Sequence, residues 1–178
     1  DDGPFGVQME AMADPFREGH HILRVGVQAK RYAPENRPPL HLTFLVDVSG
    51  SMSSADKLGL AKKSMHTLID NLGEGDTVAM ATYAGRVARI LEPTEATERD
   101  RIHAAIDGLR SGGSTAMSSG IDLAYEMADE AFEKGAENRV VILSDGDANV
   151  GSTSMEAMLK QIKGFASQGV TLSTIGFG

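Results

Sequence analysis

Hydrophobic residues between positions 40 and 178 follow two alternating spacings. Short apolar runs, rich in β-branched residues, predict buried strands. Between these runs, apolar residues recur every three or four positions, which predicts helices with one buried face. The predicted strands cover residues 42–46, 77–83, 140–143 and 170–175, and the helical faces include Leu58, Ile102, Ile121 and Met155. Strands that alternate with helices indicate an α/β fold, a doubly wound and mostly parallel sheet with helices on both faces.

Several element ends also have local signals. Ala84 to Arg86 can form a turn into residues 87–91, which predicts one antiparallel edge strand. Thr97 is a candidate N-cap for the helix that follows, and Gly73 a candidate end for the helix that begins near Asp56.

The first 39 residues have a different pattern. Residues 1–19 show no clear periodicity and predict an irregular leader. Apolar and polar residues then alternate from 21 to 30, which predicts a strand with one buried face. Three prolines within residues 32–39 indicate a linker. The pattern therefore divides the chain into residues 1–39, with leader, strand and linker, and a domain over residues 40–178.

Candidate chemistry is concentrated directly after the strand 42–46. Asp47 ends that strand, and Ser49 and Ser51 follow in a short loop. In an open α/β sheet, ligands bind outside the carboxyl ends of the strands. One carboxylate and two hydroxyls offer only oxygen, which suits Mg²⁺, Mn²⁺ or Ca²⁺.

The pattern Asp47-x-Ser49-x-Ser51 resembles the opening motif of von Willebrand factor type A (vWA) domains, which carry a metal-ion-dependent adhesion site (MIDAS). Thr115 in SGGST and Asp145 in LSDGD stand where that family has its distant threonine and aspartate. The resemblance runs from about Leu40 to the C-terminus and is closest to bacterial vWA proteins with a companion region before the domain.

This resemblance implies a Rossmann-like fold and a metal site made of Asp47, Ser49, Ser51, Thr115 and Asp145. It implies that the hydroxyls bind the ion directly and that the aspartates act mostly through water. An ion with neutral direct ligands stays electrophilic, so a carboxylate from a partner protein can complete its shell. The family domain also continues with a C-terminal helix, which is expected to be missing from a chain that stops soon after the strand 170–175.

Other interpretations of the same residues are weaker. Both serines, and Thr115, are also typical helix caps. Asp145, Asp147, Asn149 and Glu156 match the first, third, fifth and twelfth positions of an EF-hand calcium loop, but Val150 stands where that loop needs glycine. The five histidines are interpreted as structural or solvated, and three of them as isolated: His41, His66 and His103.

Composition excludes several classes of function. The net charge of −8 leaves no basic surface for a nucleic acid. The chain has no cysteine, so it has no disulfide, thiolate metal site or cysteine nucleophile. No apolar run approaches the roughly 20 residues of a membrane span. The nucleophile-elbow pattern G-x-S-x-G and the phosphate-loop pattern G-x-x-x-x-G-K are both missing from the sequence, so an enzyme is not expected.

We therefore predict a metal-dependent protein-binding module for adhesion or scaffolding, whose Mg²⁺ (or Mn²⁺ or Ca²⁺) accepts an acidic group of a protein ligand. The predicted location is the bacterial cell envelope or the extracellular space, with the cytoplasm left open. One alternative is an intracellular assembly factor that partners an AAA+ ATPase, and a less favoured one is a Mg²⁺-dependent hydrolase.

Overall fold

The computed structural model describes residues 5–29, 37–113, 117–146 and 155–178. The chain divides into two compact units, Asp1–Arg37 and Pro38–Gly178.

The first unit contains a β-hairpin. Strands β1 (Phe5–Ala13) and β2 (His21–Ala29) pair in antiparallel register along their whole length. The expected irregular leader is therefore wrong for residues 5–13. That segment also alternates with a period of two, but Met12 interrupts its polar positions and hides the pattern.

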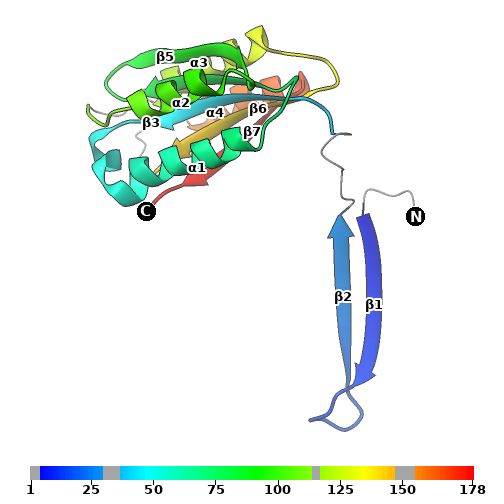
Figure 1. The fold of residues 1–178 in the computed structure, drawn as a ribbon. Helices are drawn as coiled ribbons and strands as arrows, with labels where there is room; N and C mark the ends of the chain where they lie inside the picture. The colour runs from blue at the N-terminus through cyan, green and yellow to red at the C-terminus, as the bar shows by residue number, and fades with distance from the viewer. Residues whose placement is uncertain (1–4, 30–36, 114–116, 147–154) are drawn as a thin grey trace. The chain divides into compact units, whose positions relative to one another are not determined.

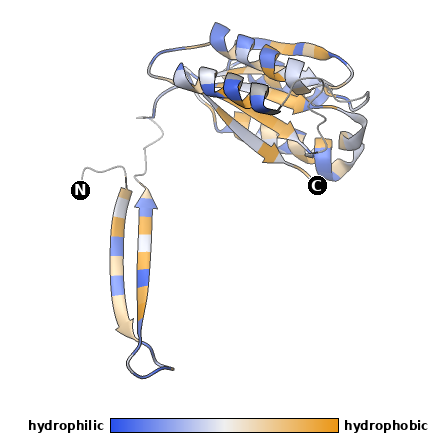
Figure 2. Ribbon diagram, turned by 180° about the vertical axis from the view of Figure 1, so that it is seen from behind, coloured by the Kyte–Doolittle hydropathy of each residue, from blue (hydrophilic) through white to orange (hydrophobic). Residues whose placement is uncertain are grey.

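The alternation does not bury one face of the hairpin, contrary to expectation. Cross-strand partners share a face of a sheet, and one face of the hairpin is apolar except at its turn end, where Ala13 pairs with His21. Figure 2 shows the alternation of hydrophobic and hydrophilic residues along both strands. Every residue of both strands is nevertheless exposed except Gly26, which is half-buried. The period of two correctly predicted a strand over residues 21–29. The period alone does not specify what covers an apolar face.

The second unit has a five-stranded sheet in the order β5-β4-β3-β6-β7 (Figure 1). Strand β3 (Leu40–Asp47) is central, and β4 (Thr77–Tyr83), β6 (Glu137–Ser144) and β7 (Val170–Gly176) run parallel to their inner neighbours. Strand β5 (Val87–Glu95) is the predicted antiparallel edge strand. The predicted mostly parallel sheet is confirmed.

Helices cover both faces of this sheet. Along β3, Phe44 and Val46 pack in one hydrophobic cluster with α1 (Leu60–Asp70) and α2 (Arg99–Gly108). Leu45 points the other way, into a second cluster with residues of α3 (Met117–Glu130) and α4 (Met155–Ser167). The two clusters follow from the period of two in a strand that is buried on both faces, and they confirm the doubly wound α/β class.

Some predicted helix ends are wrong. Glu98, not Thr97, is the N-cap of α2, and it makes no side-chain capping bond. The segment after Asp47 first forms a 3₁₀ turn, η2 (Gly50–Ser53), and a π-helical turn, η3 (Ala55–Gly59), before α1 begins. Helix α1 then ends at Asp70, three residues before Gly73.

Helix α3 lies unusually close to the sheet at Gly120. A Cβ atom on Gly120 would stand 2.9 Å from the Cβ of Tyr83 and 3.2 Å from Cδ1 of Leu45. Glycine here lets the helix pack directly over the strand ends that carry the polar residues described next.

Candidate metal centre

Three neighbouring strands end in polar residues at the same edge of the sheet. Asp47 ends β3 in register with Tyr83, the last residue of β4. Val46 of β3 is in register with Leu143 of β6, so Ser144, the last residue of β6, ends beside Asp47. Parallel pairing thus gathers a carboxylate, a phenol and a hydroxyl at the carboxyl edge.

Both carboxylate oxygens of Asp47 accept hydrogen bonds. The backbone N–H of Ser49 donates to Oδ1 at 2.8 Å. The hydroxyls of Tyr83 and Ser144 each donate to Oδ2 at 3.2 Å. Asp47 is fully buried. A buried carboxylate needs such donors, and here they fix its orientation from three segments of the chain.

Tyr83 is itself fully buried. Burial raises the pKa of its phenol well above the ordinary value, and the negative charge of Asp47 raises it further, although a hydrogen bond with Ser144 acts in the opposite direction. The phenol therefore stays protonated over the physiological pH range and remains a donor to Asp47.

The two serines of the predicted site lie together. Ser49 Oγ and Ser51 Oγ form a hydrogen bond at 3.0 Å, in which either hydroxyl can be the donor. Ser49 is buried, whereas Ser51 is exposed. The pair therefore links the buried carboxylate edge to the solvent side of the loop.

Asp145 pairs with a lysine of the same region. Lys57 Nζ, from the η3 turn, donates to Asp145 Oδ2 at 2.9 Å. The Asp145 side chain is 1% exposed and that of Lys57 is 27% exposed. This contact is a charge-assisted hydrogen bond whose carboxylate is almost completely shielded from solvent.

The glycine-rich loop that leads to Thr115 is bonded to the serine loop. Gly112 N–H donates to Val48 C=O at 2.7 Å, and Gly50 N–H donates to Gly113 C=O at 3.1 Å. Gly113 has a φ of +91°, and a Cβ there would meet Gly85 N at 3.0 Å, so this close approach needs glycine. Thr115 itself lies outside the described residues, as do Asp147, Asn149 and Val150 of the EF-hand alternative.

The described residues fit a hard divalent cation. Ligands of Mg²⁺ at about 2.0–2.1 Å in adjacent octahedral positions stand about 2.8–3.0 Å apart, and the two serine oxygens have this separation. Two carboxylates nearby, Asp47 and Asp145, supply negative charge. Ser49 and Ser51 could hold the ion directly, with Asp47 orienting the loop that carries them.

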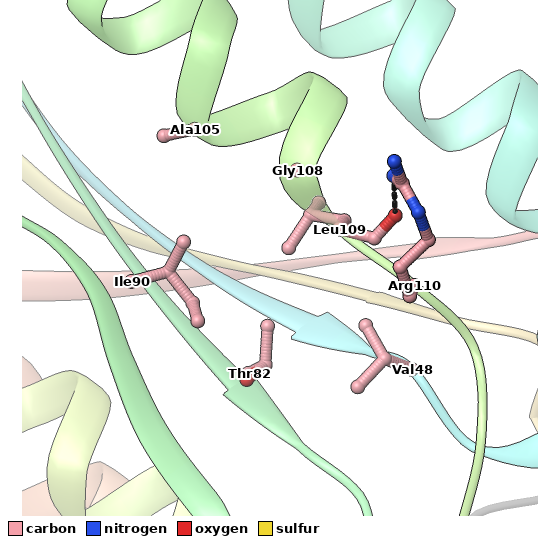
Figure 3. A pocket seen from close by; sticks show the side chains of 7 residues that line it. All are labelled: Val48, Thr82, Ile90, Ala105, Gly108, Leu109 and Arg110. Atoms are coloured by element: carbon pink, nitrogen blue, oxygen red, sulfur yellow. Dashed lines mark hydrogen bonds between the residues drawn. The ribbon is translucent and has the colours of Figure 1, made fainter.

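A pocket of about 240 Å³ lies beside α2, close to this edge (Figure 3). Arg110 at its rim donates to the C=O of Leu109 at 2.8 Å. The pocket has mainly apolar walls, so it suits an apolar group rather than an ion. Its lining comprises Val48, Thr82, Ile90, Ala105, Gly108, Leu109 and Arg110.

Sequence reasoning missed three residues that contact the predicted ones: Tyr83, Ser144 and Lys57. The first two had a signal, because Tyr83 ends the predicted strand 77–83 and Ser144 directly follows the predicted strand 140–143, so both lie at the carboxyl edge of the sheet. Lys57 had none, since its contact with Asp145 joins residues 88 positions apart.

Comparisons with known proteins agree with this fold. Residues 41–178 match the von Willebrand factor type A domain. YfbK of Escherichia coli (strain K12), an uncharacterized protein, is 38% identical over 175 residues, which are 98% of this chain but 30% of that protein. The chain thus spans less than a third of the length of this relative.

Solved structures show the same fold at lower identity. A von Willebrand factor type A protein from Catenulispora acidiphila superposes with a TM-score of 0.66 at 21% identity, over 97% of this chain and 40% of that one. Manganese-loaded TRAP protein of Plasmodium vivax superposes with a TM-score of 0.64 at 17% identity, over 98% of this chain and 62% of that one. Within the described part of the chain, no helix combines the length and apolar character that a membrane crossing needs.

Proposed function

This chain belongs to the von Willebrand factor type A domain family, and on that premise we propose that it is a metal-dependent protein-binding module. In this proposal a divalent cation is bound by Ser49, Ser51 and Thr115, with Asp47 and Asp145 in support. When bound, the ion would supply the positive charge to which an acidic side chain of a partner protein could bind.

The observation that carries the proposal is the position of Ser49 and Ser51. Their hydroxyls are hydrogen-bonded to each other at 3.0 Å, a separation that adjacent ligands of Mg²⁺ also have. The N–H of Ser49 is held by Asp47, and Gly50 is held by Gly113, so the loop has little freedom to rearrange. A site that is ordered before it binds loses less entropy on binding.

The same geometry favours binding over catalysis. Both oxygens of Asp47 are occupied by donors. A carboxylate that already accepts three hydrogen bonds in a buried place is a weak general base or nucleophile. It is well suited to hold Ser49 in place while the neutral hydroxyls leave the charge of the ion available to an acidic group. When bound, the ion supplies the electrophile that this acidic group contacts.

The donor set suits Mg²⁺ or Mn²⁺ and admits Ca²⁺. We further propose that residues 40–178 form the binding domain, that residues 1–39 precede it, and that the protein acts at the bacterial cell envelope or outside the cell. A bacterial relative such as YfbK supports the bacterial setting.

Calorimetric titration with Mg²⁺ and Mn²⁺ tests the site. Ser51→Ala removes one exposed hydroxyl and should weaken Mn²⁺ binding at least tenfold, which is about 1.4 kcal/mol. Ser64→Ala is the matched control, because its hydroxyl is on the exposed side of α1 and donates to the Leu60 carbonyl of the same helix. Equal affinity in wild type, Ser51→Ala and Asp47→Ala would refute the metal site.

Partner chemistry needs a separate measurement. A glutamate-bearing peptide should bind the metal-loaded chain and should lose binding when chelator is added or when the glutamate is replaced by glutamine. Metal binding without any dependence of peptide binding on the metal would leave a cation site and refute the adhesion mechanism.

A further inference from the structure

Two histidines that the sequence separates by 37 positions meet between the helices α1 and α2. His66 Nδ1 and His103 Nδ1 are 2.5 Å apart. The expectation that both were isolated is therefore wrong, because helix pairing brings together residues whose distance in sequence gives no signal. The ring centroids are 4.6 Å apart and the ring planes are inclined by 25°. With the two Nδ1 atoms only 2.5 Å apart, these atoms lie between the centroids.

A carboxylate holds the outer nitrogen of each ring. His66 Nε2 lies 3.0 Å from Asp107 Oδ1, and His103 Nε2 lies 3.2 Å from Asp70 Oδ1. An ionised carboxylate only accepts hydrogen bonds, so each Nε2 must carry hydrogen. In a neutral imidazole this arrangement leaves the lone pair on Nδ1.

The two Nδ1 lone pairs therefore point at one place. Two lone pairs this close repel unless an electron-pair acceptor lies between them. A carboxylate on the far nitrogen is also the arrangement that orients metal-binding histidines and raises their basicity. The described residues contain this arrangement twice, and each histidine–carboxylate pair joins α1 to α2.

We propose that His66 and His103 form a second cation site, selective for transition metals such as Zn²⁺, Ni²⁺ and Cu²⁺. Imidazole nitrogen suits these ions, whereas Mg²⁺ and Ca²⁺ favour oxygen. The site is distinct from the oxygen-lined edge at Asp47, since its ligands come from the facing surfaces of α1 and α2. Its occupant would join the two helices.

The size of the site sets its expected strength. Two nitrogens on one tetrahedral zinc ion, each at about 2.0–2.1 Å, stand about 3.3–3.4 Å apart, so the rings must separate by less than 1 Å. The side chains are 28% and 25% exposed, so water reaches the site. Among the described residues no group of three histidine or acidic side chains could hold a metal ion, so water completes the shell and the affinity is moderate.

Titration with Zn²⁺, and electron paramagnetic resonance with Cu²⁺, test this proposal. We expect one nitrogen-ligated Cu²⁺ per chain and a rise in melting temperature with Zn²⁺. His103→Gln should lose both. The double variant His20→Gln, His21→Gln removes two imidazoles from the N-terminal unit and should retain both the Cu²⁺ signal and the rise in melting temperature.

Two further variants distinguish loss of the histidine metal site from loss of folding, and from effects at the proposed site beside Asp47. Asp70→Asn keeps both ligands and should weaken Zn²⁺ binding by about tenfold, as loss of an orienting carboxylate does. Ser51→Ala should not change the nitrogen signal. If Zn²⁺ and Cu²⁺ at millimolar concentration give no signal that depends on His66 or His103, only a proton lies between the rings and the proposal is overturned.

Discussion

Lys57 provides the sharpest test of the electrostatics at the strand edge. Its ammonium donates to Asp145, a carboxylate that is almost completely buried and that the proposed metal site needs. Lys57→Met keeps the length and most of the apolar stem of the side chain but removes the charge. The substitution therefore isolates the positive charge next to Asp145.

The stability effect has a calculable size. A hydrogen bond to a charged group contributes about 1.5–3 kcal/mol. Lys57 is 27% exposed, so solvent screens part of this contact, and we expect a loss of about 1–2 kcal/mol. For a chain of this length, each kcal/mol lowers the melting temperature by about 2–4 °C.

The same substitution should act in the opposite direction on metal binding. Without the ammonium, a cation near Asp145 no longer meets a like charge, and Mg²⁺ affinity should rise by about tenfold or more, equivalent to about 1.4 kcal/mol. Added Mg²⁺ should therefore raise the melting temperature of Lys57→Met more than that of wild type.

The assay is thermal unfolding with and without Mg²⁺, alongside calorimetric titration. Lys63→Met, on the exposed side of α1, removes an equal charge and is the control. If Lys57→Met and Lys63→Met bind Mg²⁺ equally well, the Lys57–Asp145 pair only stabilises the fold and Asp145 is not part of a cation site.

Three other substitutions give independent checks. Gly120→Ala should lower the free energy of unfolding in urea by about 1–3 kcal/mol, because the new Cβ would lie 2.9 Å from the Cβ of Tyr83. This clash should outweigh the better helix propensity of alanine. Unchanged stability would mean that α3 can move away from the sheet. Tyr83→Phe leaves the buried carboxylate without one donor and should cost about 1–3 kcal/mol. Hydrogen bonds from Arg89 lower the pKa of Glu130. The pair therefore stabilises the fold at pH values above the ordinary glutamate pKa, and this stabilisation is lost as the pH falls through the lowered pKa of Glu130. In Arg89→Gln, NMR titration should find the Glu130 pKa back near its ordinary value.

The sheet was predictable because its signal is local. Strands such as β4 are short apolar runs, and a strand buried on both faces needs only its composition to be recognised. The position of Asp47 at a strand end followed from the same pattern. The hairpin strand β1 was missed because Met12 and the nearby glycines and prolines obscure its alternation. The exposure of its apolar face depends on what surrounds it, which no period in the sequence specifies.

The candidate site was predictable only in part, for a related reason. Asp47, Ser49 and Ser51 stand within one loop, so their spacing shows that they lie together. Contacts across the sheet and between helices have no such spacing. Lys57 with Asp145, and His66 with His103, become neighbours only when the elements pack. A histidine that is isolated in the sequence can therefore have a partner on the next helix.

The arrangement around Asp47 explains why the edge can be both buried and ready to bind. The carboxylate is held from its own loop by Ser49 and from the two neighbouring strands by Tyr83 and Ser144. These donors stabilise the charge of Asp47 inside the protein. Asp47 can therefore stay buried while Ser51, in the loop that follows, is exposed to solvent.

Gly113 holds the same loop from the other side, because its carbonyl accepts a hydrogen bond from the N–H of Gly50. A ligand that reaches the edge therefore meets oxygen atoms in a loop that is already held, and movement of this loop must break its bonds to Asp47 and to Gly113. This is why loss of a donor such as Tyr83 should weaken both folding and metal binding, whereas loss of Ser51 should weaken binding alone.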